Sequence, residues 1–190
     1  VTSAWHMPRA MGVFRKASFA VEAFPVDYLT EEELSEFVRV SGRAPRGLGI
    51  AAHRSFNTYV ASVVEVEVDA RGTVRVPRIE QVVDAGIIVN PDRVRAQMEG
   101  SAVMAVGLAR TGEITAVGGR IQQSNFNNFQ VARMNDAPIQ VNVHMVPSDA
   151  LPTGVGEPGL PPVLAALGNA IFAATGKRVR ELPLSRQKLV

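Results

Sequence analysis

Alternating apolar and charged side chains predict strands in the middle and later parts of the chain. Residues 59–69, YVASVVEVEVD, alternate valine with acidic residues, which is the period of a half-buried strand. After a short turn, residues 73–86 predict a second strand, with Pro77 at a bulge or an edge because proline cannot donate to a strand ladder. Residues 113–123 predict a hairpin over a Gly-Gly pair, and residues 139–146 alternate again as a strand.

A helical period predicts two longer helices. In residues 89–109 the apolar positions recur along one stripe, with Asn90 as N-cap and Pro91 at the first helical position. Residues 160–178 are apolar almost all round, which is typical of a helix buried in a protein or in an assembly. Gly176, followed by two basic residues, is a good C-terminal stop for this helix.

These elements predict the fold class and a division of the chain. Strands and helices are mixed without a strict βαβ repeat, so we expect an α+β fold of mixed or antiparallel strands with packed helices. Residues 30–40 predict a helix that starts with acidic side chains, and 41–47 predict a loop at an internal boundary. We therefore separate an N-terminal segment, 1–45, which has no clear assignment, from residues 46–190.

Composition excludes several kinds of site. The 190 residues have a formal net charge of +2, with acidic and basic residues interspersed, so a basic face for nucleic acid is not expected. Cysteine is absent, which excludes disulfides, thiolate zinc sites and iron–sulfur clusters held by this chain. Three scattered histidines show no metal-ligand spacing, and His144 is expected on an exposed strand face. No segment reaches the roughly 18 apolar residues of a membrane helix, and compartment stays undecided.

Glu157 is the first candidate for chemistry. It stands in GVGEPGLPP, just before the expected start of the apolar helix, among three glycines: Gly154, Gly156 and Gly159. The helix dipole favours an ionised carboxylate there, whereas burial in an apolar loop would raise its pKa, and the two effects together suit a general base. Glycines let the backbone approach a ligand closely. The spacing alone is more typical of a capping charge at a helix start.

Gln97 is the second candidate. It lies in the segment DAGIIVNPDRVRAQMEG, residues 84–100, where a strand end and a glycine turn precede a capped helix that presents Gln97, Glu99 and Gly100. A glutamine amide donates and accepts hydrogen bonds together, which suits the edge of a heterocycle or a phosphate oxygen. An isolated helical glutamine is also a common solvent-facing residue.

The two motifs together resemble a known enzyme family. The order DAG…NP…QMEG, then GVGEPGLPPVLAALGNAIFAATG about sixty residues later, resembles the C-terminal part of the molybdopterin-binding subunit of the xanthine dehydrogenase/aldehyde oxidase family. RGLGIAAHRSFNTYVASVVEVEVD (46–69) and GRIQQSNFNNF (119–129) are most similar to its isoquinoline 1-oxidoreductase beta-subunit branch. The resemblance covers residues 46–190 as a portion of that domain and is much weaker over 1–45.

The resemblance implies a site and a mechanism. In this family the glutamate matching Glu157 takes a proton from a hydroxo ligand of molybdenum, whose oxygen attacks an electron-poor carbon of a small N-heteroaromatic or aldehyde substrate. Gln97 would hydrogen-bond the pterin, and Gly100, Gly154, Val155 and Gly156 would lie beside the cofactor. That cofactor would be a molybdenum-pterin of the molybdopterin cytosine dinucleotide type. Its dithiolene holds the metal, so no protein metal ligand is expected.

The resemblance also implies partners and leaves alternatives. The remainder of the molybdopterin-binding subunit and an iron–sulfur subunit that accepts electrons would complete the enzyme. Ser101 stands where the family commonly has Gly or Ala, and the family's subunit is several times longer than these 190 residues. The start at Val1 rather than Met suggests a fragment, a processed chain or an engineered piece. A non-catalytic structural or interaction module of the same fold, without bound cofactor, and a small-ligand domain in which Glu157 is a helix cap remain open.

Overall fold

A computed structural model describes residues 45–190 of the protein. The helix expected at 30–40 lies outside the described residues, as does nearly all of the 1–45 segment. The division of the chain at residue 45 therefore stays a prediction.

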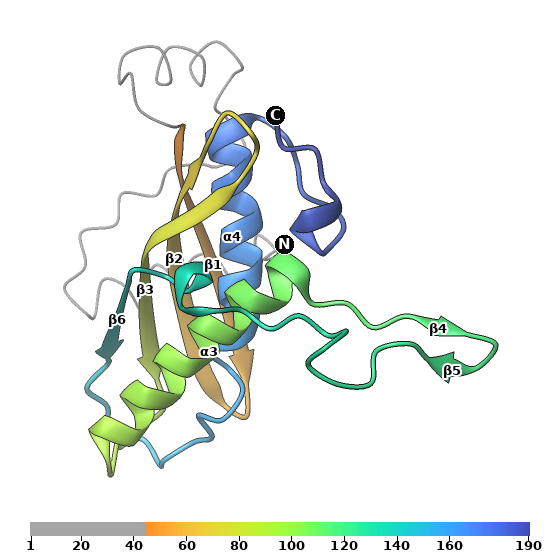
Figure 1. Ribbon diagram of the computed structural model, residues 1–190. Helices are drawn as coiled ribbons and strands as arrows, with labels where there is room; N and C mark the ends of the chain where they lie inside the picture. The colour runs from red at the N-terminus through yellow and green to blue at the C-terminus, as the bar shows by residue number, and fades with distance from the viewer. Residues whose placement is uncertain (1–44) are drawn as a thin grey trace.

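One four-stranded sheet forms the centre of the fold (Figure 1). Strands β1 (Arg46–Ser55), β2 (Thr58–Val68) and β3 (Val74–Asp84) pair antiparallel in sequence order. Strand β6 (Gln140–Met145) joins parallel to β3, so the order is β1-β2-β3-β6. The sheet is mixed, as the α+β prediction expected.

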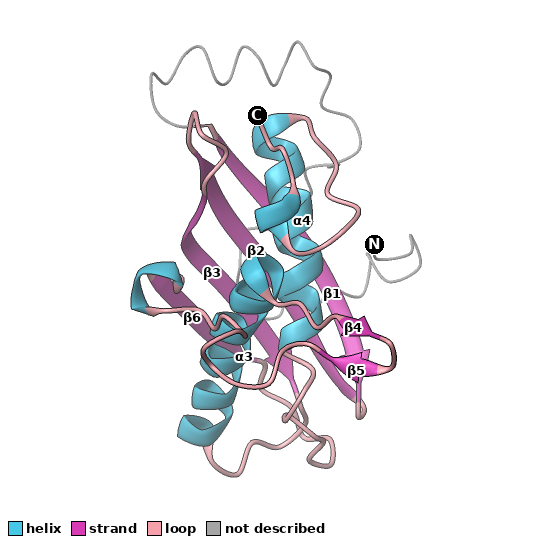
Figure 2. Cartoon of the chain, turned by 45° about the vertical axis from the view of Figure 1, so that its right-hand side comes forward, coloured by secondary structure: helices cyan, strands magenta, loops and turns pink. Residues whose placement is uncertain are grey.

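Two helices cover one face of the sheet, α3 (Pro91–Thr111) and α4 (Leu160–Thr175) (Figure 2). Helix α4 lies directly on β1. The two elements are so close that a Cβ at Gly47 or Gly49 would overlap a backbone carbonyl of the helix. Residues 45–190 also contain two short 3-10 helices, η1 (Met134–Asp136) and η2 (Leu184–Arg186). A small hairpin of β4 (Ala116–Val117) and β5 (Arg120–Ile121) projects from the body (Figure 1).

Hydrophobic alternation along β2 decides which face of the sheet meets the helices. The three valines of its second half are fully buried and belong to the main core cluster, which also contains small and branched side chains of α3 and α4. Between them Glu65 and Glu67 point to the opposite face, where Arg46 pairs with both carboxylates. The period of two thus produces an apolar face under the helices and, along the second half of β2, a charged face behind them. The rest of that rear face carries a second apolar cluster around Ala61 and Val82.

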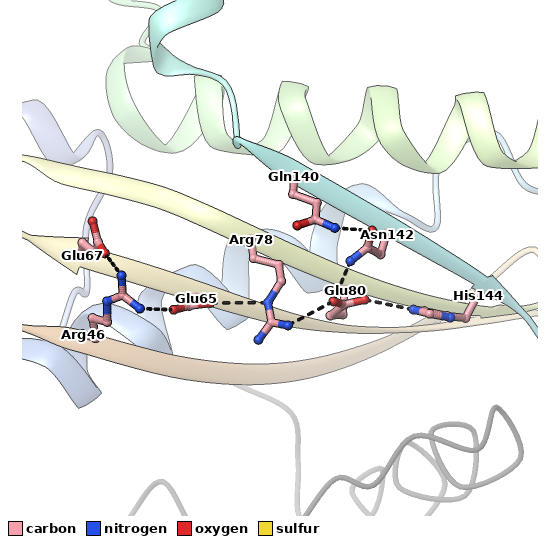
Figure 3. Close-up of polar contacts among 8 residues, drawn as sticks. All are labelled: Arg46, Glu65, Glu67, Arg78, Glu80, Gln140, Asn142 and His144. Carbon is pink, nitrogen blue, oxygen red and sulfur yellow. Dashed lines mark hydrogen bonds and ion pairs between the residues drawn. The ribbon is translucent and has the colours of Figure 1, made fainter.

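The charged face continues across β3 to β6 (Figure 3). Arg78 bridges Glu65 at 3.4 Å and Glu80 at 3.7 Å, and the His144 Nε2 lies 2.9 Å from the second oxygen of Glu80. Asn142 donates to the same carboxylate at 2.8 Å. His144 lies on the polar face of its strand as expected, but it is half-buried instead of exposed, because the parallel pairing of β6 with β3 places its ring against the buried Glu80.

Most of the predicted elements are confirmed. The Asn90 side chain accepts a hydrogen bond from the Arg93 N–H at 3.1 Å, and Pro91 opens α3. Gly176 ends α4 in the left-handed conformation. The β2–β3 register shifts between Glu65 and Glu67, opposite Pro77, so this proline lies at a bulge.

Strand β1 was not predicted, and the loop expected at 41–47 is wrong for Arg46 and Gly47, which begin that strand. Its inward positions carry glycine and alanine instead of large apolar side chains, so the hydrophobic period is weak there. Among the described residues, no helix is long and apolar enough to cross a membrane.

Candidate functional site

The connection between β6 and α4 carries Glu157, and its first half lies against the residues that follow β3. The Ile87 N–H donates to the Ala150 carbonyl at 2.9 Å, and the Thr153 N–H donates to the Ala85 carbonyl at 2.9 Å. A Cβ at Gly86 would overlap the Leu151 carbonyl. The glycine of the DAG motif therefore allows two backbone segments to touch. We call residues 150–159 the Glu157 loop.

The turn between β1 and β2 holds the middle of the Glu157 loop. Phe56 and Asn57 form a two-residue turn with positive φ at both positions, the geometry that suits a tight hairpin. The Thr58 Oγ1 donates to the Gly154 carbonyl at 2.6 Å and lies 2.6 Å from the Thr153 hydroxyl. Because Thr58 has one hydroxyl proton and uses it for the carbonyl, Thr153 is the donor in the second bond.

Gln97 contacts the loop next to Glu157. Its Nε2 donates to the Gly156 carbonyl at 2.6 Å, across 59 residues of sequence. The QMEG motif on α3 and the GVGEPG motif before α4 thus meet in space.

A second glutamine, Gln81 on β3, reaches the end of the loop. Its Nε2 donates to the Gly159 carbonyl at 2.8 Å and to the Ser62 Oγ at 3.3 Å. The side chain is fully buried, and its Oε1 is the single buried side-chain N or O atom without a hydrogen-bond partner among residues 45–190. An unsatisfied buried acceptor costs about 1–3 kcal/mol. We did not identify this residue from the sequence, although a glutamine inside the apolar run of a strand was the available signal.

Glu157 itself lies just outside α4, as predicted from the expected helix start. Its carbonyl accepts from the Leu160 N–H at 3.2 Å, whereas its carboxylate makes no hydrogen bond or ion pair with the described residues and is exposed. The N-cap residue is Gly159, which offers no side-chain cap. Glu157 is therefore not a hydrogen-bonding helix cap, and the burial expected around it is not found in the described part of the chain.

The glycines around Glu157 differ in what they allow. A Cβ at Gly159 would overlap the Ser101 Oγ, and one at Gly154 would lie 3.0 Å from the Phe56 Cβ, so both positions are used for packing. A Cβ at Gly156 or Gly100 would meet no atom of residues 45–190 within 4 Å. Open space therefore lies beside Gly156 and beside the end of the QMEG motif. Val155 is half-buried and packs against the cluster around Met98.

Ser101 fits its position as a small residue. Its Oγ donates to the Met98 carbonyl at 2.7 Å within α3, and the side chain contacts the bare Cα of Gly159. Among residues 45–190, no cluster of three His, Asp or Glu side chains could hold a metal ion.

The sequence comparison decides the family. The sequence model of the "Molybdopterin cofactor-binding domain" family matches residues 16–138, more than half of the chain. The chain belongs to this family. The match includes the sheet strands β1 to β3, helix α3 with Gln97, and the projecting hairpin, and it ends before Glu157.

Individual relatives extend the similarity over most of the chain. The isoquinoline 1-oxidoreductase beta subunit of Brevundimonas diminuta is 35% identical over 158 residues, which are 82% of this chain and 20% of that protein. The aldehyde oxidoreductase molybdenum-binding subunit PaoC of Escherichia coli is 34% identical over 171 residues, or 85% of this chain and 22% of that protein. The chain thus spans about one fifth of the length of these curated relatives.

A solved structure shows the same fold. The aldehyde oxidoreductase from Desulfovibrio desulfuricans superposes with a TM-score of 0.59 at 28% identity, covering 67% of this chain and 14% of that one. The mixed sheet with two helices on one face is therefore a portion of the molybdopterin-binding fold, as the resemblance predicted.

Proposed function

We propose that this chain forms part of the large subunit of a molybdenum hydroxylase, in which it supplies the general base Glu157 and one wall of the cofactor site. The observation that carries the proposal is the 2.6 Å hydrogen bond from the Gln97 Nε2 to the Gly156 carbonyl. It brings the QMEG motif beside Gly156, the residue that precedes Glu157.

The residues around Glu157 fit a molybdenum-pterin group. Space beside Gly100 and Gly156 is open, the exposed amide of Gln97 still has an acceptor oxygen, and no protein metal ligand is needed. When bound, the group supplies a metal that accepts two electrons from the substrate. Gln97, together with Gly100, Gly154, Val155 and Gly156, would line it, and we propose the molybdopterin cytosine dinucleotide form.

Glu157 is placed to accept a proton. Helix α4 begins three residues later, and the N-terminus of a helix attracts negative charge, which suits the position of a general base. The Gly156 carbonyl accepts from the Gln97 side chain and the Glu157 carbonyl accepts from the Leu160 N–H, so the backbone that carries the carboxylate is held on both sides. The names of the relatives support a small N-heteroaromatic or aldehyde substrate.

Partners must complete the site. The chain spans about one fifth of its relatives' length, and Glu157 is exposed within it. Residues 112–133, which we call the arm, expose large apolar side chains such as Val117 and Phe126. We propose that residues 46–190 pack with the rest of a molybdopterin-binding subunit, and that an iron–sulfur subunit accepts the electrons.

The test is Glu157→Gln in the assembled enzyme that contains this chain. Loss of a general base lowers the rate of the chemical step by about 10²–10⁴-fold, while folding and cofactor content stay unchanged. Glu181→Gln, at an exposed carboxylate after α4, is the matched control and should leave turnover unchanged. If the substrate still reduces the metal at the wild-type rate in Glu157→Gln, the proposal is refuted.

A non-catalytic module of the same fold is the second candidate, and the exposure of Glu157 favours it. Metal and pterin analysis of the assembly purified from its natural source separates the two. Molybdenum and pterin in stoichiometric amounts support the catalytic function, whereas their absence supports the structural one.

A further inference from the structure

Three side-chain donors hold three successive parts of the Glu157 loop. The Gly154 carbonyl accepts from Thr58, the Gly156 carbonyl from Gln97 and the Gly159 carbonyl from Gln81. The donors come from β2, α3 and β3, and each is separated from its acceptor by 59 or more residues. The loop is thus bound to three different elements within six residues of its length.

Burial distinguishes two of these donors from the third. Thr58 and Gln81 are both fully buried, whereas Gln97 is exposed. Gln81 is kept in the core although its Oε1 has no partner there. Rotating the amide would bring that oxygen against the Gly159 carbonyl, so this carbonyl fixes the orientation of the side chain. A buried polar group with an unsatisfied acceptor adds little to stability, and its contribution is to fix the position of the group that it binds.

The backbone between the bonds leads to Glu157. Gly154 and Gly159 lie three residues before and two residues after it. Gly156 and Gly159 carry no side chain, so the path of the chain there depends on hydrogen bonds to their carbonyls and on the close packing of Gly159 against Ser101. We propose that Gln81 and Thr58 are positioning residues, which act through the Gly159 and Gly154 carbonyls to fix the backbone that carries Glu157. The inference rests on the proposed function for its catalytic consequence but not for its structural part.

Hydrogen exchange tests the structural part on this chain without cofactor. Gln81→Met and Thr58→Val each remove one donor and nearly keep side-chain volume. We expect exchange at the Gly154 and Leu160 amides to accelerate about tenfold, since one hydrogen bond of typical net strength is lost. Global exchange in α3 and β2 should not change. Gln140→Met, which removes an exposed amide bonded to Asn142, is the control and should leave the loop unchanged.

The assembled enzyme tests the catalytic part. Gln81→Met should lower kcat about 10- to 100-fold with little change in KM, because a misplaced catalytic group slows the chemistry without weakening substrate binding. In a Glu157→Gln background, Gln81→Met should have no further effect.

The outcomes separate the two proposals. Unchanged hydrogen exchange in both Gln81→Met and Thr58→Val overturns the inference. It is also overturned if Gln81→Met lowers kcat by the same factor in the wild-type enzyme and in the Glu157→Gln variant. If Gln81→Met does not fold, Thr58→Val alone decides. Full activity of Glu157→Gln instead refutes the proposed function, and the exchange result still decides whether the loop is positioned by these two residues.

Discussion

The Glu157 loop and the arm are both irregular connections, yet different interactions define their shapes. Donors to the loop carbonyls lie 59 to 96 residues away in the sequence. In the hairpin half of the arm the bonds are local: Gln123 pairs with Thr115, eight residues away. Figure 1 shows the hairpin of the arm extending away from the sheet and helices, while the loop runs along their ends.

This difference shows which of the two segments has its conformation fixed by contacts within the described residues. The loop reaches its conformation through contacts to β2, β3 and α3, so the position of Glu157 is decided within this chain. The arm turns apolar side chains outward, among them Ile121 and Phe126, and exposed apolar groups of this kind mark interaction surfaces when they gather in one region. The catalytic positioning and the assembly that we propose thus fall on separate segments.

The largest effect on stability is expected where the loop touches α3. In Gly159→Ala the added Cβ would overlap the Ser101 Oγ and lie 2.9 Å from the Met98 Sδ. We expect the free energy of unfolding to fall by about 1–3 kcal/mol, as in other overpacked sites, measured by denaturant titration. Gly156→Ala, where the new Cβ meets no atom within 4 Å, is the control. Equal losses in the two variants would mean that packing does not hold the loop.

An intermediate effect should separate the two segments directly. Gln97→Met removes the bond to the Gly156 carbonyl, and Gln123→Met removes the bonds to Thr115. Gln97→Met should weaken the loop by about 1 kcal/mol, the net value of one hydrogen bond, and Gln123→Met should weaken the arm by about that amount for each bond to Thr115 that it loses. Hydrogen exchange should accelerate in the loop only for Gln97→Met and in the arm only for Gln123→Met. Acceleration in both segments from either variant would contradict the comparison.

The smallest effect on stability is expected on the arm. Phe126 is 72% exposed, so Phe126→Ser should change the free energy of unfolding by no more than about 0.5 kcal/mol. If the arm contacts the rest of the proposed subunit, the same substitution should weaken that association in a binding assay. A large loss of stability in the isolated chain would instead show that the arm belongs to the core.

Much of the fold could be predicted from the sequence because its signals are local. The N-cap Asn90, the terminal Gly176 and the alternating valines of β2 each act through neighbours within a few residues. Strand β1 escaped prediction because glycine and alanine replace large apolar side chains where α4 lies on it. The close approach of that helix is a tertiary contact, and the local hydrophobic period does not predict it.

The candidate site divides in the same way. Glu157 and Gln97 could be singled out from their motifs, and the hydrogen bond to Gly156 shows that the two motifs meet. Gln81 and Thr58 were not singled out, because their acceptors are carbonyls 78 and 96 residues later in the chain. The position of a glutamine inside a strand was the one local signal for Gln81. Every residue has a backbone carbonyl, so the sequence does not indicate which carbonyl a side chain will bind.

By itself the sequence determined the main elements, the α+β class, the resemblance to molybdopterin-binding subunits and the position of Glu157 before a helix. Only the tertiary structure decided that Gly154 and Gly159 serve packing while Gly156 faces open space, that His144 pairs with a buried glutamate, and that two buried donors hold the loop. The physical reason is the distance along the chain over which each interaction acts. Capping and periodicity act between neighbours in the chain, whereas steric exclusion and hydrogen bonds to carbonyls act between any groups that folding brings together.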